Sequence, residues 1–271
     1  MPTENNNQWT NQDDPFFADY FTGAAPVETP YAGASTPEST LQRRILNLLF
    51  VIDVSGSMRG ERIGQVNYAL EDIFKELRNR EDLNSQLSVG LMTFCDRASW
   101  LTPHPIPLED YAFTPIKVQP YFTYYGNAFL ELERVLHRSA FMNPDLGEYY
   151  APVILFITDG EPLDVNEYPK ALETLKRNKW FAKSAKYAIA VGEESKNSYI
   201  GEILAQFTGQ RENVRYADEG AKLCELIEYI AVRASEVQTS VGSSSSGKKK
   251  GKDSIFDSVD SGLFGSIFSG V

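Results

Sequence analysis

Short apolar runs alternate with amphipathic segments through the middle of the chain. Residues 45–52 are apolar except for Asn47, and because this run is shorter than a typical helix it predicts a strand buried on both faces. Apolar residues spaced by three and four over 63–77 predict an amphipathic helix. Four further strands are predicted at 87–94, 153–157, 187–191 and 214–216, a short edge strand at 98–101, and four further helices at 128–136, 172–180, 200–207 and 223–232.

This alternation predicts the fold class. Apolar strands separated by helices form mostly parallel sheets with helices on both faces, so we predict a doubly wound α/β domain with a six-stranded sheet. One of these six strands, at residues 98–101, would be a short antiparallel strand at one edge. In such sheets, ligands bind beyond the carboxyl ends of the strands, where the strand order reverses.

The two ends of the chain lack this alternation. Residues 1–40 are rich in Asn, Pro, Thr and Gly without a sustained period, which predicts a flexible arm. Residues 241–252 have the Gly, Ser and Lys composition of a linker. Residues 253–271 carry an apolar residue at every fourth position, which is typical of an interaction helix. We therefore predict an arm, one domain at 41–240, a linker and an apolar tail.

Both ends are candidates for contacts with other molecules. Residues 16–21 of the arm hold three Phe and one Tyr beside acids, and these aromatic residues either pack on the chain's own domain or bind a partner. The apolar tail either docks in a groove of a partner, which we favour, or folds back onto the domain. Attachment to a membrane surface ranks last, since the four lysines of the linker and tail attract anionic lipid only weakly.

Charge and cysteine content narrow the function classes. The formal net charge is −11, and residues 1–40 contribute six acids with no Lys or Arg. This acidity argues against nucleic acid, because binding to phosphates needs a clustered basic face. Two cysteines, Cys95 and Cys224, fit a reducing compartment, and neither a signal-peptide pattern nor a long apolar run is evident. We therefore expect a cytoplasmic protein that does not enter a membrane.

Oxygen-bearing side chains follow two of the predicted strands. Asp53, Ser55 and Ser57 stand at alternate positions after the first strand, so an extended turn directs them to one side. Asp159 directly follows the strand at 153–157. If these two strands are neighbours at the point of reversal, both carboxylates meet in one crevice. Helix capping would explain Asp53 and Ser55 but not the arrival of Asp159, whereas Mg²⁺ prefers such an oxygen set.

At these residues the chain resembles a known family. The sequence Asp-Val-Ser-Gly-Ser-Met at 53–58 resembles the metal-ion-dependent adhesion site (MIDAS) of von Willebrand factor A (VWA) domains. The resemblance spans roughly residues 41–237. It continues through Gly60, Asn67, Phe94, Gly126 and the run Thr-Asp-Gly-Glu-Pro-Leu-Asp at 158–164. That last run is similar to the bacterial tellurite-resistance-associated (TerY-like) VWA proteins.

The resemblance implies a Rossmann-like fold and a set of metal ligands. Asp53, Ser55 and Ser57 would bind Mg²⁺, with Ca²⁺ or Mn²⁺ as alternatives, directly or through water, and Asp159 would lie close by. The family supplies a further ligand from a threonine in a turn before the middle helix. Here Asn127 stands where we expect that threonine, and its amide oxygen can bind a metal. Thr123 is the alternative donor, and the sequence leaves the choice open.

The resemblance also implies a function. A VWA domain with this site binds a protein partner whose Asp or Glu completes the coordination of the metal. Bacterial relatives of the TerY-like type sit beside Ser/Thr protein kinases and PP2C-like phosphatases, so the resemblance implies a phospho-signalling scaffold in stress response, tellurium resistance or defence. The alternative is a structural subunit of a larger assembly, held in place by its two tails, with a vestigial metal site.

Enzymatic alternatives lack necessary residues. A haloacid-dehalogenase-like phosphatase needs a second aspartate two positions after its nucleophile, where this chain has Ser55. A serine hydrolase needs a base beside its nucleophile, and His104 and His137 are the only histidines. The Gly-x₄-Gly-Lys pattern at 242–248 follows no predicted strand and is followed by Lys249 instead of Ser or Thr. We therefore predict a protein without enzymatic activity.

Overall fold

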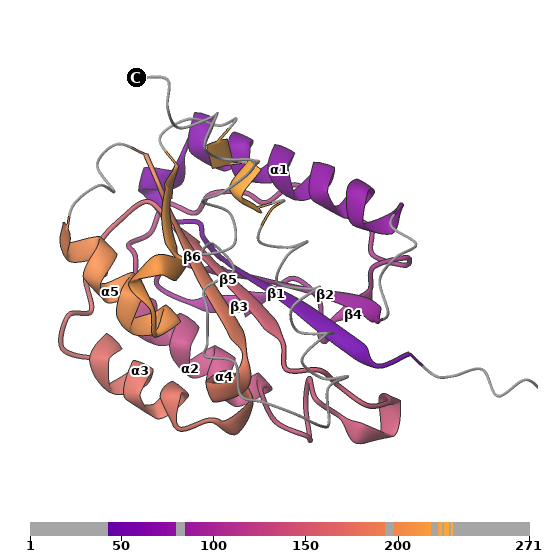
Figure 1. The fold of residues 1–271 in the computed structure, drawn as a ribbon. Coiled ribbons are helices and arrows are strands. Elements are labelled where there is room, and N and C mark those ends of the chain that lie inside the picture. The colour runs from indigo at the N-terminus through magenta and orange to yellow at the C-terminus, as the bar shows by residue number, and fades with distance from the viewer. Residues whose placement is uncertain are drawn as a thin grey trace, which may run out of the picture. The chain divides into compact units, whose positions relative to one another are not determined.

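A mostly parallel sheet forms the centre of the domain in the computed structural model of this chain (Figure 1). The structure describes residues 43–79, 85–192 and 198–217, together with residues 222, 223, 225–227 and 229. The predicted arm, linker and tail lie outside the described residues.

Seven strands pair in this sheet among the described residues, in the order β3-β2-β1-β5-β6-β7, with β4 also paired to β2. Their bounds are β1 Ile45–Asp53, β2 Gln86–Phe94, β3 Ala98–Trp100, β4 Ile106–Pro107, β5 Val153–Thr158, β6 Ala185–Val191 and β7 Val214–Ala217. β3 and β4 run antiparallel to β2, and the other pairs are parallel. The predicted α/β fold, with its antiparallel edge strand, is confirmed.

The sheet has one strand more than the six we predicted. The additional strand, β4, contains only two residues, Ile106 and Pro107, which pair with Val89 and Ser88 of β2. The proline-rich segment that contains β4 has no alternation of apolar and polar residues from which a strand could be predicted. Proline is tolerated here because β4 pairs on one side only, so its missing N–H leaves no ladder hydrogen bond unmade.

Helices cover both faces of the sheet (Figure 1). Their bounds are α1 Glu61–Arg78, α2 Tyr125–Val135, α3 Tyr168–Lys176, α4 Lys179–Lys183 and α5 Ser198–Thr208, with single 3₁₀ turns η1 Gly56–Met58, η2 Pro144–Leu146 and η4 Arg211–Asn213. Apolar side chains of α1 pack on one face, and those of α2, α3, α4 and α5 pack on the other. The domain therefore has two apolar cores with the sheet between them.

β1 runs through the middle of this arrangement, which explains its continuous apolar sequence. Leu48, Phe50 and Ile52 belong to the core beneath α1, whereas Leu49 and Val51 belong to the core on the opposite face. Because successive side chains of a strand point to opposite faces, a central strand with helices on both sides needs an apolar residue at every position.

Two predicted helices differ in detail. The segment predicted as one helix at 172–180 is two helices, because the Asn178 side chain accepts hydrogen bonds from the amides of Trp180 and Phe181 and so begins α4. The last predicted helix, 223–232, lies only partly within the described residues. Of it, Leu223, Leu226 and Ile227 are buried in the core beneath α1.

The order of strands places the reversal between β1 and β5. From β1 the chain continues to β2 on one side, and β5 lies on the other side of β1, paired with it in parallel. Ile52 and Ile157 are partners in this pairing, so Asp53 and the residues after Ile157 leave the sheet side by side. β1 and β5 are therefore neighbours, which is the condition under which the sequence predicted that Asp53 and Asp159 meet in one crevice.

Candidate metal centre

Three polar segments meet at the carboxyl ends of β1 and β5. Asp53 is the last residue of β1, Ser55 directly precedes η1, and Ser57 lies within η1. Asp159 follows β5, and Thr123 lies in the loop that precedes α2. Asp53, Ser55, Thr123 and Asp159 are buried, whereas Ser57 is exposed at the surface.

Asp53 lies at the bottom of this site, with 0% of its surface exposed. Its Oδ1 accepts a hydrogen bond of 2.8 Å from the Ser55 amide, and its Oδ2 accepts one of 2.7 Å from Thr158 Oγ1. Burial raises the pKa of Asp53 to about 6 even though these hydrogen bonds favour the carboxylate. The two donors therefore compensate only part of the cost of burying this charge.

A chain of hydrogen bonds connects the serines to the second carboxylate. Ser55 Oγ and Ser57 Oγ are 3.0 Å apart, and Ser57 Oγ donates to Asp159 Oδ1 at 2.8 Å. The other oxygen of Asp159, Oδ2, forms an ion pair of 2.6 Å with Arg62 Nη1 from the start of α1. The described structure thus brings together Asp53, Ser55, Ser57 and Asp159, as the sequence predicted.

Thr123 and Asn127 occupy different places. A methyl group built on Gly160 would lie 3.8 Å from Thr123 Oγ1 and 3.9 Å from Ser57 Oγ, so both hydroxyls flank the same glycine. Asn127 is exposed on α2, and its Nδ2 donates a hydrogen bond of 2.6 Å to the carbonyl of Asp96. The geometry favours Thr123 over Asn127 as the further donor, because Thr123 lies in the loop and Asn127 on the body of the helix.

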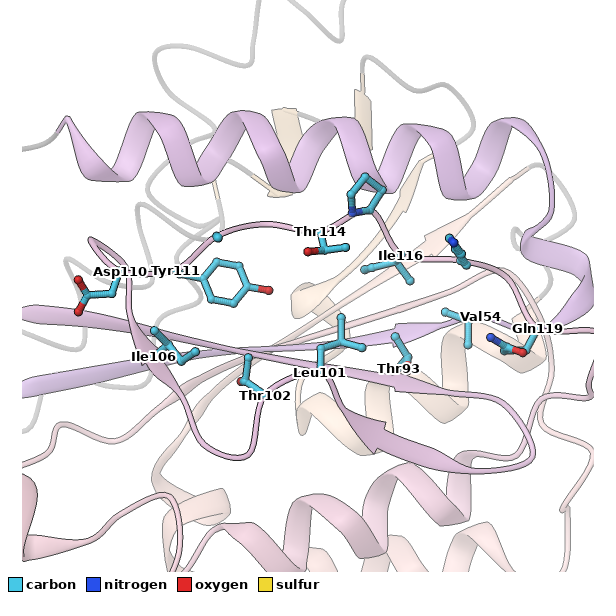
Figure 2. A pocket seen from close by; sticks show the side chains of 13 residues that line it. Val54, Thr93, Leu101, Thr102, Ile106, Asp110, Tyr111, Thr114, Ile116 and Gln119 are labelled. Atoms are coloured by element: carbon cyan, nitrogen blue, oxygen red, sulfur yellow. The ribbon is translucent and has the colours of Figure 1, made fainter.

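Ser55, Ser57 and Thr123 line a pocket of about 560 Å³, and Asp53 and Asp159 lie next to its lining through their hydrogen bonds with Ser55 and Ser57. It is bordered by Ser55, Gly56, Ser57, Arg59, Pro120, Tyr121, Phe122, Thr123, Gly160, Glu161 and Leu163. A second pocket of about 570 Å³ lies elsewhere, between the loop at 110–119 and strands β2 to β4. The side chains labelled in Figure 2 for that second pocket are threonines, aliphatic residues, Tyr111 and Gln119, with Asp110 at one end. It does not gather the donors found at the strand ends.

The donor set of the first pocket fits a hard cation. Asp53 and Asp159 supply carboxylate oxygens, and Ser55, Ser57 and Thr123 supply hydroxyl oxygens, which are the ligand types of Mg²⁺ and Ca²⁺. A cation would also neutralise the buried Asp53 charge. Among the described residues no group of three or more His, Cys, Asp or Glu side chains gathers in one place, so hydroxyls are integral to a site here.

Further polar residues hold the loops of the pocket together. The Tyr125 hydroxyl donates to the Gly160 carbonyl at 2.7 Å and contacts Thr158 Oγ1 at 3.2 Å. The Asp164 carboxylate accepts the amides of Tyr125 at 3.1 Å and Gly126 at 2.7 Å, at the start of α2. The Leu163 amide donates to the Thr123 carbonyl at 2.9 Å. The loop before α2 is therefore fastened to the loop after β5.

A second set of bonds fastens the loop before α2 to the turn after β1. The Asn67 side chain of α1 bonds both the amide and the carbonyl of Ile116. The Gln119 amide donates to the Val54 carbonyl at 2.7 Å, and the Gly56 amide donates to the Tyr121 carbonyl at 3.0 Å. The donors therefore sit on loops tied to each other and to α1.

Several of these residues were not predicted from the sequence. Arg62, Thr158, Tyr125 and Asp164 act through partners that lie 33 to 105 positions away along the chain. For Thr158 and Asp164 a signal was present, since both belong to the run at 158–164 that resembles the VWA family. Nothing in the sequence pattern distinguished Arg62 or Tyr125 from other residues of an amphipathic helix.

We predict that replacement of Gly126 by alanine disturbs the site. A methyl group there would lie 2.6 Å from Asp164 Oδ2, so the carboxylate has to move away from the start of α2. The expected loss is about 1–3 kcal/mol in the free energy of unfolding, measured by urea titration. Gly64→Ala on α1 is the matched control. No atom lies within 4 Å of that position, and alanine there should be neutral or stabilising. Equal effects of the two changes would contradict this role for Gly126.

We predict that Asp53→Asn stabilises the metal-free domain at neutral pH. Because the folded-state pKa of Asp53 is raised to about 6 from 3.8, its contribution favours the folded state below pH 4 and is lost as the pH rises through 6. The neutral amide avoids this loss, so in EDTA the variant should gain about 1–3 kcal/mol at pH 7.5 and little at pH 4. Urea titrations at both pH values test this, and a variant less stable than the unaltered protein at pH 7.5 would argue against it.

Comparisons with known proteins agree with this architecture. Residues 48–161 match the family model described as von Willebrand factor type A domain. Inter-alpha-trypsin inhibitor heavy chain H3 of Rattus norvegicus is 26% identical over 178 residues, which cover 65% of this chain and 20% of the rat protein. The Mus musculus protein of the same name matches equally. The chain thus spans about a fifth of the length of these relatives.

Solved structures support the fold. The pilus adhesin SpaC from Lactobacillus rhamnosus GG has a TM-score of 0.56 at 12% identity, covering 72% of this chain and 31% of the adhesin. Proximal thread matrix protein 1 from the mussel byssus has a TM-score of 0.51 at 19% identity, covering 71% of this chain and 46% of that protein.

None of the helices in the described part of the chain is long and apolar enough to cross a membrane. The central result is the agreement between the strand order, the oxygen donors at the reversal point and the family match over residues 48–161. On these grounds, residues 48–161 are similar to the von Willebrand factor type A domain family.

Proposed function

We propose that this chain is a metal-dependent protein-binding module. A divalent cation held by Asp53, Ser55, Ser57, Thr123 and Asp159 would bind an acidic side chain of a protein partner. The observation that carries the proposal is that two carboxylates are hydrogen-bonded to residues of a pocket lined by three hydroxyl side chains, with the Asp53 charge only partly compensated. When bound, the cation supplies a concentrated positive charge to which a carboxylate can bind directly.

The composition of the site favours an acidic partner. Of the five donor residues, only Asp53 and Asp159 are charged. Their two negative charges balance the charge of a divalent cation and leave no excess negative charge. Asp53 is buried behind Ser55, whereas Ser57 is exposed in the pocket lining, which leaves the solvent side of the site for the partner. Magnesium suits this set of hydroxyls and carboxylates, and Ca²⁺ and Mn²⁺ are alternatives with the same preference for oxygen.

We propose no enzymatic activity for this site. His104 Nδ1 lies 3.1 Å from the Pro105 carbonyl, and His137 Nε2 lies 3.1 Å from Glu133 Oε1 on α2. Neither histidine lines the pocket, so the nucleophile-and-base pair of a hydrolase is not supported in the described part of the chain. The pocket's residues are suited to holding a cation and a carboxylate.

A narrower proposal concerns the biological setting. The similarity of residues 158–164 to TerY-like proteins favours a cytoplasmic scaffold in bacterial stress-response or defence phospho-signalling, with a Ser/Thr kinase or PP2C-like phosphatase as partner. This setting rests on that short run alone. The alternative, a structural subunit held by its tails, depends on segments outside the described residues.

We predict that Mg²⁺ stabilises the domain through this site. At a concentration of 100 times Kd the gain is about 2.7 kcal/mol, which corresponds to a Tm increase of roughly 5–10 °C for a domain of this size. The Tm of Asp53→Asn should not respond to Mg²⁺. Asp145→Asn, an exposed acid-to-amide change in η2 at the opposite end of the sheet, should respond like the unaltered protein. A Mg²⁺ response that survives Asp53→Asn would overturn the proposed site.

We predict that Arg62 weakens metal binding. Its guanidinium pairs with Asp159 Oδ2 at 2.6 Å, so a cation at Asp159 must displace or repel it. Arg62→Gln should increase Mg²⁺ affinity by roughly threefold to tenfold, as expected for a partly screened charge. Calorimetric titration measures the affinity, and Lys75→Gln, at an exposed ion pair on α1, is the control. A decrease in affinity would show that Arg62 positions Asp159 for the metal.

A further inference from the structure

Large apolar side chains surround the mouth of the candidate metal pocket. Tyr121, Phe122 and Leu163 all line it, and their side chains are 49%, 65% and 57% exposed. Nine large hydrophobic residues are exposed in the described part of the chain, and three of them border this one pocket. Val165, 50% exposed, follows two positions after Leu163. We call Tyr121, Phe122 and Leu163 the apolar rim.

The rim is held in place by the bonds that position the donors. The Tyr121 carbonyl accepts the Gly56 amide, between Ser55 and Ser57. The Thr123 carbonyl accepts the Leu163 amide, so Phe122 lies between two anchored residues. The backbone of the rim is therefore fixed relative to the oxygen donors, and the exposure of its side chains is a consequence of this arrangement. Clustered, positioned apolar side chains on a surface are typical of a protein-binding site.

Charge and apolar surface meet at this pocket. The exposed Arg59 lines it beside the donors, and a bound cation would add positive charge, whereas Glu161 is the acidic side chain on the lining outside the donor set. A carboxylate is complementary to the cation and to Arg59. The aromatic and aliphatic side chains around it provide no partner for a second charged group of the ligand. Apolar side chains of the ligand can instead pack against them.

We infer that the pocket binds a protein segment in which an acidic residue stands beside aromatic or large aliphatic residues. The acidic side chain binds the cation, and its apolar neighbours cover Tyr121, Phe122 and Leu163. The inference rests on the proposed function, since the cation recognises the acid. It adds that the apolar rim selects among the many acidic segments that a metal alone would accept.

The test uses short fluorescent peptides of defined composition and the full chain loaded with Mg²⁺. Residues 11–22 of this chain, Asn-Gln-Asp-Asp-Pro-Phe-Phe-Ala-Asp-Tyr-Phe-Thr, combine three acids with four aromatic residues and serve as the first probe. A second peptide keeps the three acids and replaces the four aromatic residues by serine. A third keeps the aromatic residues and replaces the three Asp by Asn. Fluorescence anisotropy gives the Kd of each.

We expect the first peptide to bind in Mg²⁺ and not in EDTA, the second to bind at least tenfold more weakly, and the third not to bind through the metal. The double variant Tyr121→Ser, Phe122→Ser should weaken the first peptide at least tenfold and leave the weak second peptide unchanged. Tyr68→Ser on α1, 65% exposed, and Leu146→Ser in η2, 61% exposed, are controls that should leave both peptides unchanged. Circular dichroism and Mg²⁺ titration of each variant confirm the fold and the metal site.

The outcomes separate the two proposals. Equal metal-dependent binding of the first and second peptides would overturn the inference and leave the proposed function standing. Binding of no peptide to a protein that demonstrably holds Mg²⁺ would also overturn the inference. A chain that does not bind Mg²⁺ at all would overturn the proposed function itself.

Discussion

The buried carboxylate of Asp53 is the constraint on which the arrangement around the site depends. It ends the central strand of the sheet, has no exposed surface, and has a pKa raised to about 6 by that burial. A charge in this position is costly unless other groups compensate it. The Ser55 amide and the Thr158 hydroxyl each donate to it, yet the raised pKa indicates that compensation is incomplete. A divalent cation bound at the strand ends would provide the rest.

The second carboxylate shows how the chain manages charge when compensation comes from protein alone. Asp159 accepts from Ser57 and pairs with Arg62, so both of its oxygens have partners. The same ion pair places a positive group beside the candidate site, where it opposes a metal. Asp164, further along the same loop, instead accepts the first amides of α2, and burial raises its pKa while those amides oppose the shift. Three acids near one sheet edge thus have three environments, which the backbone around them determines.

Much of the fold and of the candidate site could be predicted from the sequence. The continuous apolar character of residues 45–52 correctly predicted a strand covered on both faces, because alternate side chains of β1 enter different cores. The positions of Asp53 and Asp159 after two such strands predicted their convergence, and the pairing of β1 with β5 confirms it. The choice between Thr123 and Asn127 as the further donor could not be made from the sequence. The two residues are only four positions apart, and α2 begins between them at Tyr125, so that Thr123 lies in the loop and Asn127 in the helix. Arg62 and Tyr125 were missed for a similar reason, since their partners become neighbours only through the packing of α1 and α2.

The central claim is that oxygen atoms of Asp53, Ser55, Ser57, Thr123 and Asp159 bind one cation. An anomalous diffraction experiment tests this claim most directly. Crystals grown with Mn²⁺ and measured at the manganese absorption edge would locate the metal without assumption. The account predicts a single strong peak between the strand ends, about 2 Å from the hydroxyl oxygens of Ser55 and Ser57, with Thr123 and the two aspartates in direct or water-mediated contact. A peak bound by Asn127, or no peak between β1 and β5 at saturating Mn²⁺, would contradict it.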